Sequence, residues 1–169
     1  MKNKAIYIGI GSNLRSFSHK NVNIFFNCVI YRLNLLGLRV QNNSGLWVSN
    51  PMPFKSGPTY YNSVIECRYP YNYYENADNL LKKILILKKK LGKKIKGINK
   101  QRVIDIDIID FYGCVISNTV ILPHPRMHLR KFVLGPLFTL NKYWTHPIRK
   151  KNCIFLIANL RGNQFIKKK

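Results

Sequence analysis

Apolar residues follow two different spacings along the chain, and these spacings predict alternating strands and helices. Residues 5–11 alternate and end in glycines, which is typical of a short β-strand. The next segment repeats its apolar residues at helical spacing until Gly37, where the helix should stop. Those apolar positions are Val22, Phe25, Phe26, Val29, Ile30, Leu33 and Leu36. Residues 38–49 alternate again and predict a second strand.

The middle of the chain continues this order. Residues 50–58 are rich in proline and turn-forming residues and predict an irregular loop, and residues 60–69 predict a third strand. A second helix should follow, because one broad apolar stripe recurs at helical spacing. Its N-cap is Asn76 or Asp78, and it should run to about Leu91.

The last part of the pattern begins with a basic stretch without periodicity, residues 93–101, which predicts a loop. Residues 103–112 predict a fourth strand. A short hairpin through Gly113 should lead to residues 120–122, and a short helical segment should end at residues 132–134.

The predicted order β-α-β-β-α-β indicates an α+β protein with the ferredoxin-like fold, in which a four-stranded antiparallel sheet carries both helices on one face. A C-terminal hairpin and a helical extension complete it. The length favours one domain, residues 1–160, followed by a basic C-terminal tail, residues 161–169. The lysine runs 88–90 and 167–169 are expected to be solvated charge.

Acidic residues are rare in the chain and cluster in the fourth predicted strand. Three of the six lie there: Asp105, Asp107 and Asp110. Side chains alternate along a strand, so Asp105 and Asp107 should share one face while the isoleucines between them face the core. Two such carboxylates repel each other unless cations lie between them, which favours a magnesium site. The alternative is that they balance surface lysines. Asp110 falls on the opposite face of a regular strand and is expected at the surface or strand end.

Cationic side chains flank this strand in the sequence. Arg102 precedes it, and His124 and Arg130 lie in the segment PHPRMHLRKF after the predicted hairpin. Arginine can bind phosphate oxygens bidentately, and a phosphoryl-transfer site needs such donors more than a covalent nucleophile. The sequence contains no GxxxxGK[ST] phosphate loop, so a P-loop nucleotide site is excluded.

Four segments in this order resemble the 6-hydroxymethyl-7,8-dihydropterin pyrophosphokinases: YIGIGSNL at 7–14, YYN at 60–62, RVIDIDIIDFYG at 102–113 and LPHPRMHLRKFVLGPL at 122–137. The resemblance spans nearly the whole chain. It implies the ferredoxin-like fold, ATP as co-substrate and two magnesium ions. It also implies transfer of diphosphate from ATP to the hydroxymethyl group of the pterin, with AMP as the other product, in folate biosynthesis.

The resemblance also implies roles for single residues. The metal ligands would be Asp105 and Asp107, and the pterin ring would lie between Tyr60 and Phe132. The pterin site implied by the resemblance further includes Ser49, Asn50, Met52 and Asn62. The ATP-binding positions implied by it are Lys93, Arg102, Ile108, His124, Pro125 and Arg130, of which Lys93, Arg102, His124 and Arg130 would be catalytic.

The chain departs from the family pattern in two places. Lys93 and Lys94 stand where the family usually has arginines, in a loop that is about one residue shorter and lacks a tryptophan. Lys88 stands at a helix position where glutamate is common in the family. A relative that binds pterin or ATP without transfer therefore stays open as an alternative.

The net charge of +23 is the most unusual bulk property. It fits nucleic acid, an acidic membrane or a polyphosphate ligand equally well. The chain is also rich in Lys, Asn and Ile, whose codons are rich in A and T, so nucleotide bias of the genome is a sufficient explanation for much of the lysine. A basic RNA-binding protein of the same fold is the main alternative, but aspartates would occupy the strand where its exposed aromatics belong. We therefore expect ATP and pterin as partners, no specific nucleic acid, no membrane, and a monomer.

Four cysteines lie far apart in apolar stretches, which predicts buried, reduced thiols. The N-terminus has neither an apolar run nor a cleavage site of the kind found in signal peptides, and no apolar run is long enough to span a bilayer. A cytoplasmic location is expected.

Overall fold

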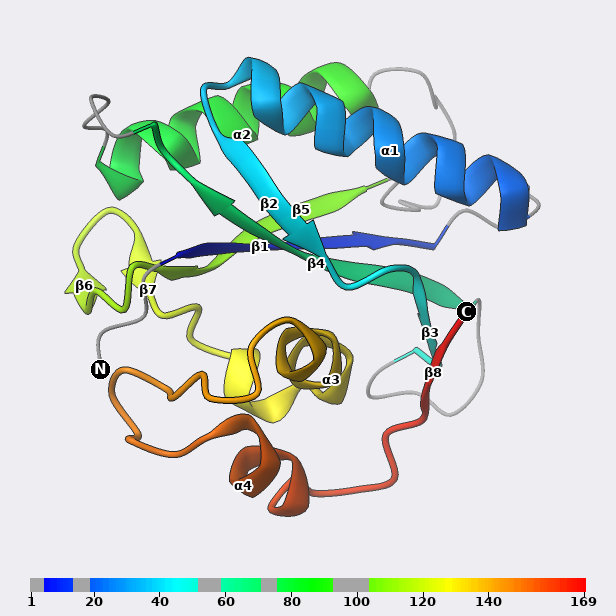
Figure 1. Ribbon diagram of the computed structural model, residues 1–169, viewed down its shortest axis with the longest axis vertical. Helices are drawn as coiled ribbons and strands as arrows, with labels where there is room; N and C mark the ends of the chain where they lie inside the picture. Colours follow the sequence, from blue (N-terminus) through cyan, green and yellow to red (C-terminus); the bar gives the residue numbers. More distant parts are fainter. Residues whose placement is uncertain (1–4, 14–18, 52–58, 71–75, 93–103) are drawn as a thin grey trace.

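The computed structural model describes residues 5–13, 19–51, 59–70, 76–92 and 104–169. Within these residues an antiparallel β-sheet forms the middle layer of the molecule, and helices cover both of its faces (Figure 1). The strands of this sheet are β1 (Ile6–Ser12), β2 (Arg39–Asn43), β3 (Trp47–Ser49), β4 (Tyr60–Arg68), β5 (Asp105–Phe111) and β8 (Ile166–Lys168). The protein is thus an α+β protein, as predicted.

Among the described residues the sheet has six strands rather than the predicted four. Its order is β5-β1-β4-β3-β8, and β2 also pairs with β4. The predicted strand 38–49 accounts for one of the extra strands, because it divides into β2 and β3. Gly45 lies at the division with a φ of 74°, a conformation that favours glycine and interrupts the ladder. Ser44 keeps the chain on β4, since its Oγ accepts a hydrogen bond from the Val64 N–H at 3.0 Å.

Two helices cover one face of the sheet, α1 (His19–Leu35) and α2 (Ala77–Gly92) (Figure 1). Asn76 is the cap of α2, because its Oδ1 accepts a hydrogen bond from the Asn79 N–H at 2.9 Å. Gly37 has a φ of 92° and follows α1 as the predicted stop. Both helices bury their apolar stripes against isoleucines of the central strands, which form the larger hydrophobic core. Its members include Ile6, Ile8, Ile10, Val22, Phe26, Val29, Leu33, Ile65, Leu80, Ile84, Ile106 and Ile108.

The C-terminal third of the chain covers the other face of the sheet (Figure 1). It contains the hairpin strands β6 (Ile116–Ser117) and β7 (Ile121–Leu122), a 3-10 turn η1 (Met127–Leu129), and the helices α3 (Lys131–Leu140) and α4 (Cys153–Ala158). The two predicted helices of the ferredoxin-like unit, α1 and α2, thus share one face as predicted, and the predicted C-terminal hairpin and helical extension lie on the other side.

Helix α3 begins where the sequence predicted a helix to end. Gly135 and Pro136 lie inside it, and Pro136 cannot donate the helical hydrogen bond to Phe132. Val133, Leu134 and Leu137 are nonetheless buried in a second core with Tyr7 and Ile109. This burial stabilises the helix more than the missing hydrogen bond weakens it.

The expected basic tail contains a short strand that was not predicted. Ile166–Lys168 forms β8 and pairs antiparallel with β3. A Cβ on Gly135 would meet the Ile166 Cδ1 at 2.5 Å, so α3 packs closely against this last strand. The division of the chain at residue 160 remains a prediction. Lys167, Lys168 and Lys169 are exposed, as the prediction of solvated charge requires, although the backbone of Lys167 and Lys168 extends the sheet.

Asp110 is completely buried, contrary to the prediction of a surface position. A register shift between Tyr7 and Ile8 of β1 makes β5 irregular at this point. The Asp110 side chain therefore turns to the second core, where it accepts hydrogen bonds from Trp144 Nε1 at 2.7 Å and from the Gly113 N–H at 2.9 Å. The predicted position of Asp110 holds only for a regular strand.

Two of the four cysteines are buried as predicted, and two are not. Burial raises the pKa of Cys67 and of Cys153 to about 12, so both are inert thiols. Cys28 and Cys114 are exposed. Among the helices that the structure describes, none combines the length and the apolar character needed to cross a membrane.

Candidate functional site

A cleft of about 560 Å³ opens where the ends of three neighbouring strands meet. Antiparallel pairing places Gly11 of β1 opposite Asp105 of β5 on one side and opposite Asn62 of β4 on the other. Residues that are far apart in sequence thus form one row across the sheet. The segment from Arg126 to Val133 forms the opposite wall.

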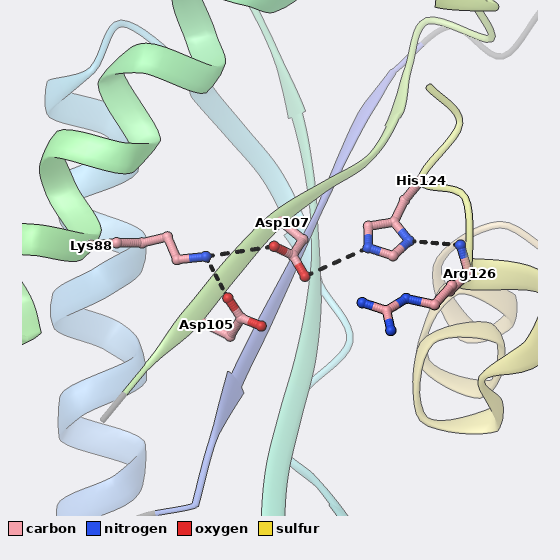
Figure 2. A network of polar contacts seen from close by, with 5 residues as sticks. All are labelled: Lys88, Asp105, Asp107, His124 and Arg126. Atoms are coloured by element: carbon pink, nitrogen blue, oxygen red, sulfur yellow. Dashed lines mark hydrogen bonds and ion pairs between the residues drawn. The ribbon is translucent and has the colours of Figure 1, made fainter. Parts of the chain in front are cut away.

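The acidic pair lies at the β5 side of this cleft, as strand alternation predicted. Asp105 and Asp107 line the cleft with about a third of each side chain exposed, whereas the isoleucines between and after them are buried in the larger core. The ammonium of Lys88, on α2, forms an ion pair with Asp105 Oδ1 and lies 3.6 Å from Asp107 Oδ1 (Figure 2). The prediction that residues 88–90 are solvated charge is therefore wrong for Lys88.

His124 faces the acidic pair from the other side (Figure 2). Its backbone N–H bonds to the Ile109 carbonyl at 2.9 Å, which ties the segment to β5. Its Nδ1 accepts a hydrogen bond from the Arg126 N–H at 3.1 Å, so the neutral ring carries its proton on Nε2. Nε2 lies 3.8 Å from Asp107 Oδ2. Burial lowers the pKa of His124, and the nearby Arg130 lowers it further, although Asp107 opposes both effects.

Arg130 supplies a partly buried cation to the same cleft. Burial lowers the pKa of Arg130, and so does the neighbouring Arg126, yet a guanidinium stays charged at neutral pH. Its Cζ lies 5.6 Å from the centre of the Phe132 ring. Gln164 fixes this wall, because its Oε1 accepts from the Lys131 N–H at 2.8 Å and its Nε2 donates to the Leu129 carbonyl at 3.0 Å.

The β4 side of the cleft carries amide, hydroxyl and aromatic groups instead of charges. Asn62 and Ser49 are buried there, and Asn62 Nδ2 donates to Ser49 Oγ at 3.0 Å. Asn13 Nδ2 donates to the Tyr60 hydroxyl at 3.3 Å. The buried Asn13 Oδ1 has no hydrogen-bond partner among the residues that the structure describes. This side therefore offers an acceptor to a bound molecule.

Most of the site residues expected from the sequence converge on this cleft. Those that line it are Ser49, Asn50, Tyr60, Asn62, Asp105, Asp107, Arg130 and Phe132. His124 lies next to the cleft residue Asp107, and the following residue, Pro125, is exposed. The Ile108 side chain lies in the larger core, away from the cleft. Met52, Lys93 and Arg102 fall outside the described residues. The individual roles of all these residues remain predictions.

Several cleft residues were missed by the sequence argument. Gly9, Gly11, Ser12 and Asn13 line the cleft from β1 and the residue after it, and Leu129 lines it from the opposite wall. Arg126, which belongs to the cationic segment PHPRMHLRKF, lines the same wall. A Cβ on Gly9 would meet Ile109 Cδ1 at 3.0 Å, so glycine allows the close approach here. The motif GIGSN was noted as a strand end and as part of one segment that carries the resemblance, without a role in the site. Its alignment with β5 could have indicated a place in the site.

A sequence model of the family described as "7,8-dihydro-6-hydroxymethylpterin-pyrophosphokinase (HPPK)" matches residues 7–142. The chain belongs to this family. The match includes β1, β4, β5 and α3, which are the elements that build the cleft.

Relatives of this pyrophosphokinase family include both long and short proteins. The chain is 38% identical over 149 residues to "Folic acid synthesis protein fol1" of Pneumocystis carinii, covering 86% of this chain and 19% of that protein. It is 27% identical over 135 residues to "2-amino-4-hydroxy-6-hydroxymethyldihydropteridine pyrophosphokinase" of Helicobacter pylori, covering 78% of each chain. A Porphyromonas gingivalis protein with the same name is 29% identical over 147 residues, covering 84% of this chain and 93% of that protein. The chain thus spans about a fifth of the fungal relative but most of the two bacterial ones.

Proposed function

We propose that the protein transfers diphosphate from ATP to the hydroxymethyl group of 6-hydroxymethyl-7,8-dihydropterin. The products are AMP and the pterin diphosphate, and the reaction serves folate biosynthesis. One observation carries the proposal: a single cleft joins an uncharged side, lined by Asn62 and Tyr60, to a charged side with Asp105, Asp107 and Arg130. A flat heteroaromatic acceptor and a polyphosphate donor require such neighbouring environments.

The uncharged side of the cleft suits the pterin. Tyr60 and Phe132 lie on opposite walls and would hold the ring by stacking. The Asn62 amide would read the donor and acceptor pattern along the ring edge, and its bond to Ser49 fixes its orientation in advance. Asn13 Oδ1, buried and without a partner among the described residues, would accept a hydrogen bond from the ligand. Asn50, and Met52 outside the described residues, complete the proposed pterin site.

The charged side of the cleft suits magnesium. Asp105 and Asp107 already hold one cationic group, the Lys88 ammonium, against their carboxylates. No cluster of three or more His, Cys, Asp or Glu side chains able to hold a metal occurs among the described residues, so protein ligands alone would leave the shell incomplete. Magnesium commonly binds through one or two carboxylates, waters and substrate phosphates, and Asp105 and Asp107 would supply the two carboxylates. We propose two such ions; when bound, they would neutralise phosphate charge and align the donor for in-line attack.

The cations of the opposite wall would bind the phosphates of ATP. Arg130 is partly buried and its guanidinium lies near the Phe132 ring, so it would offer phosphate oxygens a bidentate donor. His124 presents Nε2–H toward the acidic pair and would donate to a phosphate oxygen beside it. Lys93 and Arg102 are proposed partners outside the described residues, and Ile108 and Pro125 are proposed ATP contacts. The walls would exclude water from the transferred group.

We also propose a fold type, a location and an oligomeric state for the protein. The order β1, α1, β2 with β3, β4, α2, β5 fits the ferredoxin-like arrangement, with β8 and the C-terminal helices added to it. We propose a cytoplasmic monomer that acts on ATP and pterin, without a specific nucleic acid or membrane partner.

The proposal is tested with purified full-length protein, ATP, magnesium and 6-hydroxymethyl-7,8-dihydropterin. We expect AMP to form only when the pterin is present, and Asp107→Asn to reduce the rate at least about a hundredfold, because it removes a charge placed for the transition state. Glu66→Gln is the matched control: it also removes one carboxylate from the sheet, and the amide can keep the bond from Asn42. AMP formation without pterin, or an equal loss in both variants, would refute the proposed function.

A further inference from the structure

Lys88 occupies the place where a metal ion would be expected. Its ammonium is ion-paired with Asp105 and lies 3.6 Å from Asp107 Oδ1, so one group neutralises part of the charge of both carboxylates (Figure 2). About a quarter of the Lys88 side chain is exposed, and about a third of each aspartate. The contact is therefore partly shielded from solvent.

The packing of α2 fixes the direction in which Lys88 points. Ile84 and Leu87 are buried against the sheet, and Lys88 follows them at the border of this apolar stripe. Because α2 packs on β5, which is an edge strand, a side chain at this border reaches the cleft around the edge of the sheet. Lys89 and Lys90 are exposed instead. Lys88 therefore contacts the acidic pair because of its position on α2, and the two lysines that follow it in sequence do not share this position.

A divalent cation and the ammonium cannot both sit between these carboxylates. Their separation would be a few ångströms, and like charges at that distance repel strongly where water is partly excluded. The carboxylate oxygens that Lys88 contacts would also be lost as metal ligands while the ion pair persists. Metal entry therefore requires Lys88 to leave.

We propose that Lys88 is an internal counter-ion that holds the acidic pair and must be displaced when metal enters, so that free metal binds weakly on its own. This rests on the metal site of the proposed function. Metal that arrives with ATP brings phosphate oxygens as additional ligands and offers the displaced ammonium an anion to bind. Lys88 thereby favours loading of metal together with nucleotide over loading of metal alone.

The test measures binding of Mn²⁺, used as the probe metal, to the full chain by electron paramagnetic resonance, with and without ATP. Without ATP, Lys88→Met should bind Mn²⁺ at least about fivefold more tightly than the unaltered protein, equivalent to about 1 kcal/mol, at the upper end for an exposed ion pair. Lys89→Met is the matched control on the same helix and should bind as the unaltered protein does. With ATP, the advantage of Lys88→Met should shrink.

Thermal unfolding gives a second readout. In metal-free buffer Lys88→Met should unfold at a lower temperature, since the two carboxylates repel each other, and Mn²⁺ should raise its unfolding temperature more than that of the control. Lys88→Gln is the second variant if Lys88→Met folds poorly. Equal or weaker Mn²⁺ binding by the Lys88 variants would overturn the inference about Lys88 while leaving the proposed function intact. Absence of Mn²⁺ binding in every variant, with and without ATP, would overturn both.

Discussion

His146 should make the protein lose stability in mild acid. The residue is 3% exposed, and its ring lies beside His128 and beside Trp144 of the second core. Nδ1 accepts hydrogen bonds from the Ile148 and Arg149 N–H groups at 3.2 and 3.3 Å, and a proton there would break both. Burial, with smaller contributions from His128 and Arg149, lowers the pKa of His146 to about 4.

The sign and size of the effect follow from linkage. The pKa of His146 is lower in the folded state than its usual value of 6.5, so the unfolded chain binds more protons between pH 6.5 and 4. Stability that is fully present above pH 6.5 is therefore lost as the pH falls towards 4. The difference corresponds to about 3 kcal/mol at most. This is a large fraction of the total stability of a domain of this size.

Urea unfolding at a series of pH values between 7 and 4 measures this loss. In His146→Asn the amide oxygen can take the place of Nδ1 as acceptor but cannot be protonated, so its free energy of unfolding should depend less steeply on pH, by about 2 to 3 kcal/mol across the range. His128→Asn is the control and should keep most of the dependence, because burial is the main cause of the low pKa of His146. The reasoning is refuted if His146→Asn and the unaltered protein lose stability in parallel.

Three further predictions concern the second core, the proposed pterin side of the cleft and the strand β8. Trp144→Phe should lower the free energy of unfolding by about 2 kcal/mol, because Asp110 loses a buried donor at 2.7 Å; an unchanged urea midpoint would contradict this. Asn62→Ala should raise the KM for the pterin about tenfold or more with a smaller change in kcat, since its amide, held by Ser49, would bind the ring; steady-state kinetics with an unchanged KM would contradict this. Deletion of residues 165–169 removes β8 and should lower the melting temperature by about 4 °C or more; a calorimetric scan that matches the full chain would show that this strand adds nothing.

The sequence was most informative where one strand obeys simple alternation. Asp105 and Asp107 share a face because side chains alternate in β5, and the isoleucines between and after them enter the core as predicted. The same rule misplaced Asp110, since the register shift opposite Tyr7 and Ile8 adds a residue to the strand. A bulge of this kind depends on the pairing of two strands, and the pattern of one strand does not contain that information.

The C-terminal region shows a second limit of the pattern. The sequence of Ile166–Lys168 indicates only a charged chain end. These residues form a strand because they pair with the edge of β3 and because Ile166 packs against Gly135 of α3. A helix end was likewise predicted at residues 132–134, and burial of residues on both sides of Pro136 in the second core continues the helix instead. Both errors arise because contacts between distant segments decide the outcome.

Lys88 combines these two limits. Residues 88–90 are chemically identical, and any argument from charge treats them alike. The three lysines point in different directions around α2. Of the three, Lys88 stands at the border of the buried stripe formed by Ile84 and Leu87, next to the edge strand β5. A net charge of +23 therefore says little about which cations bind carboxylates within the protein. The position of each lysine on its helix determines this, and at residue 88 it places an ammonium where the acidic pair would otherwise require a metal ion.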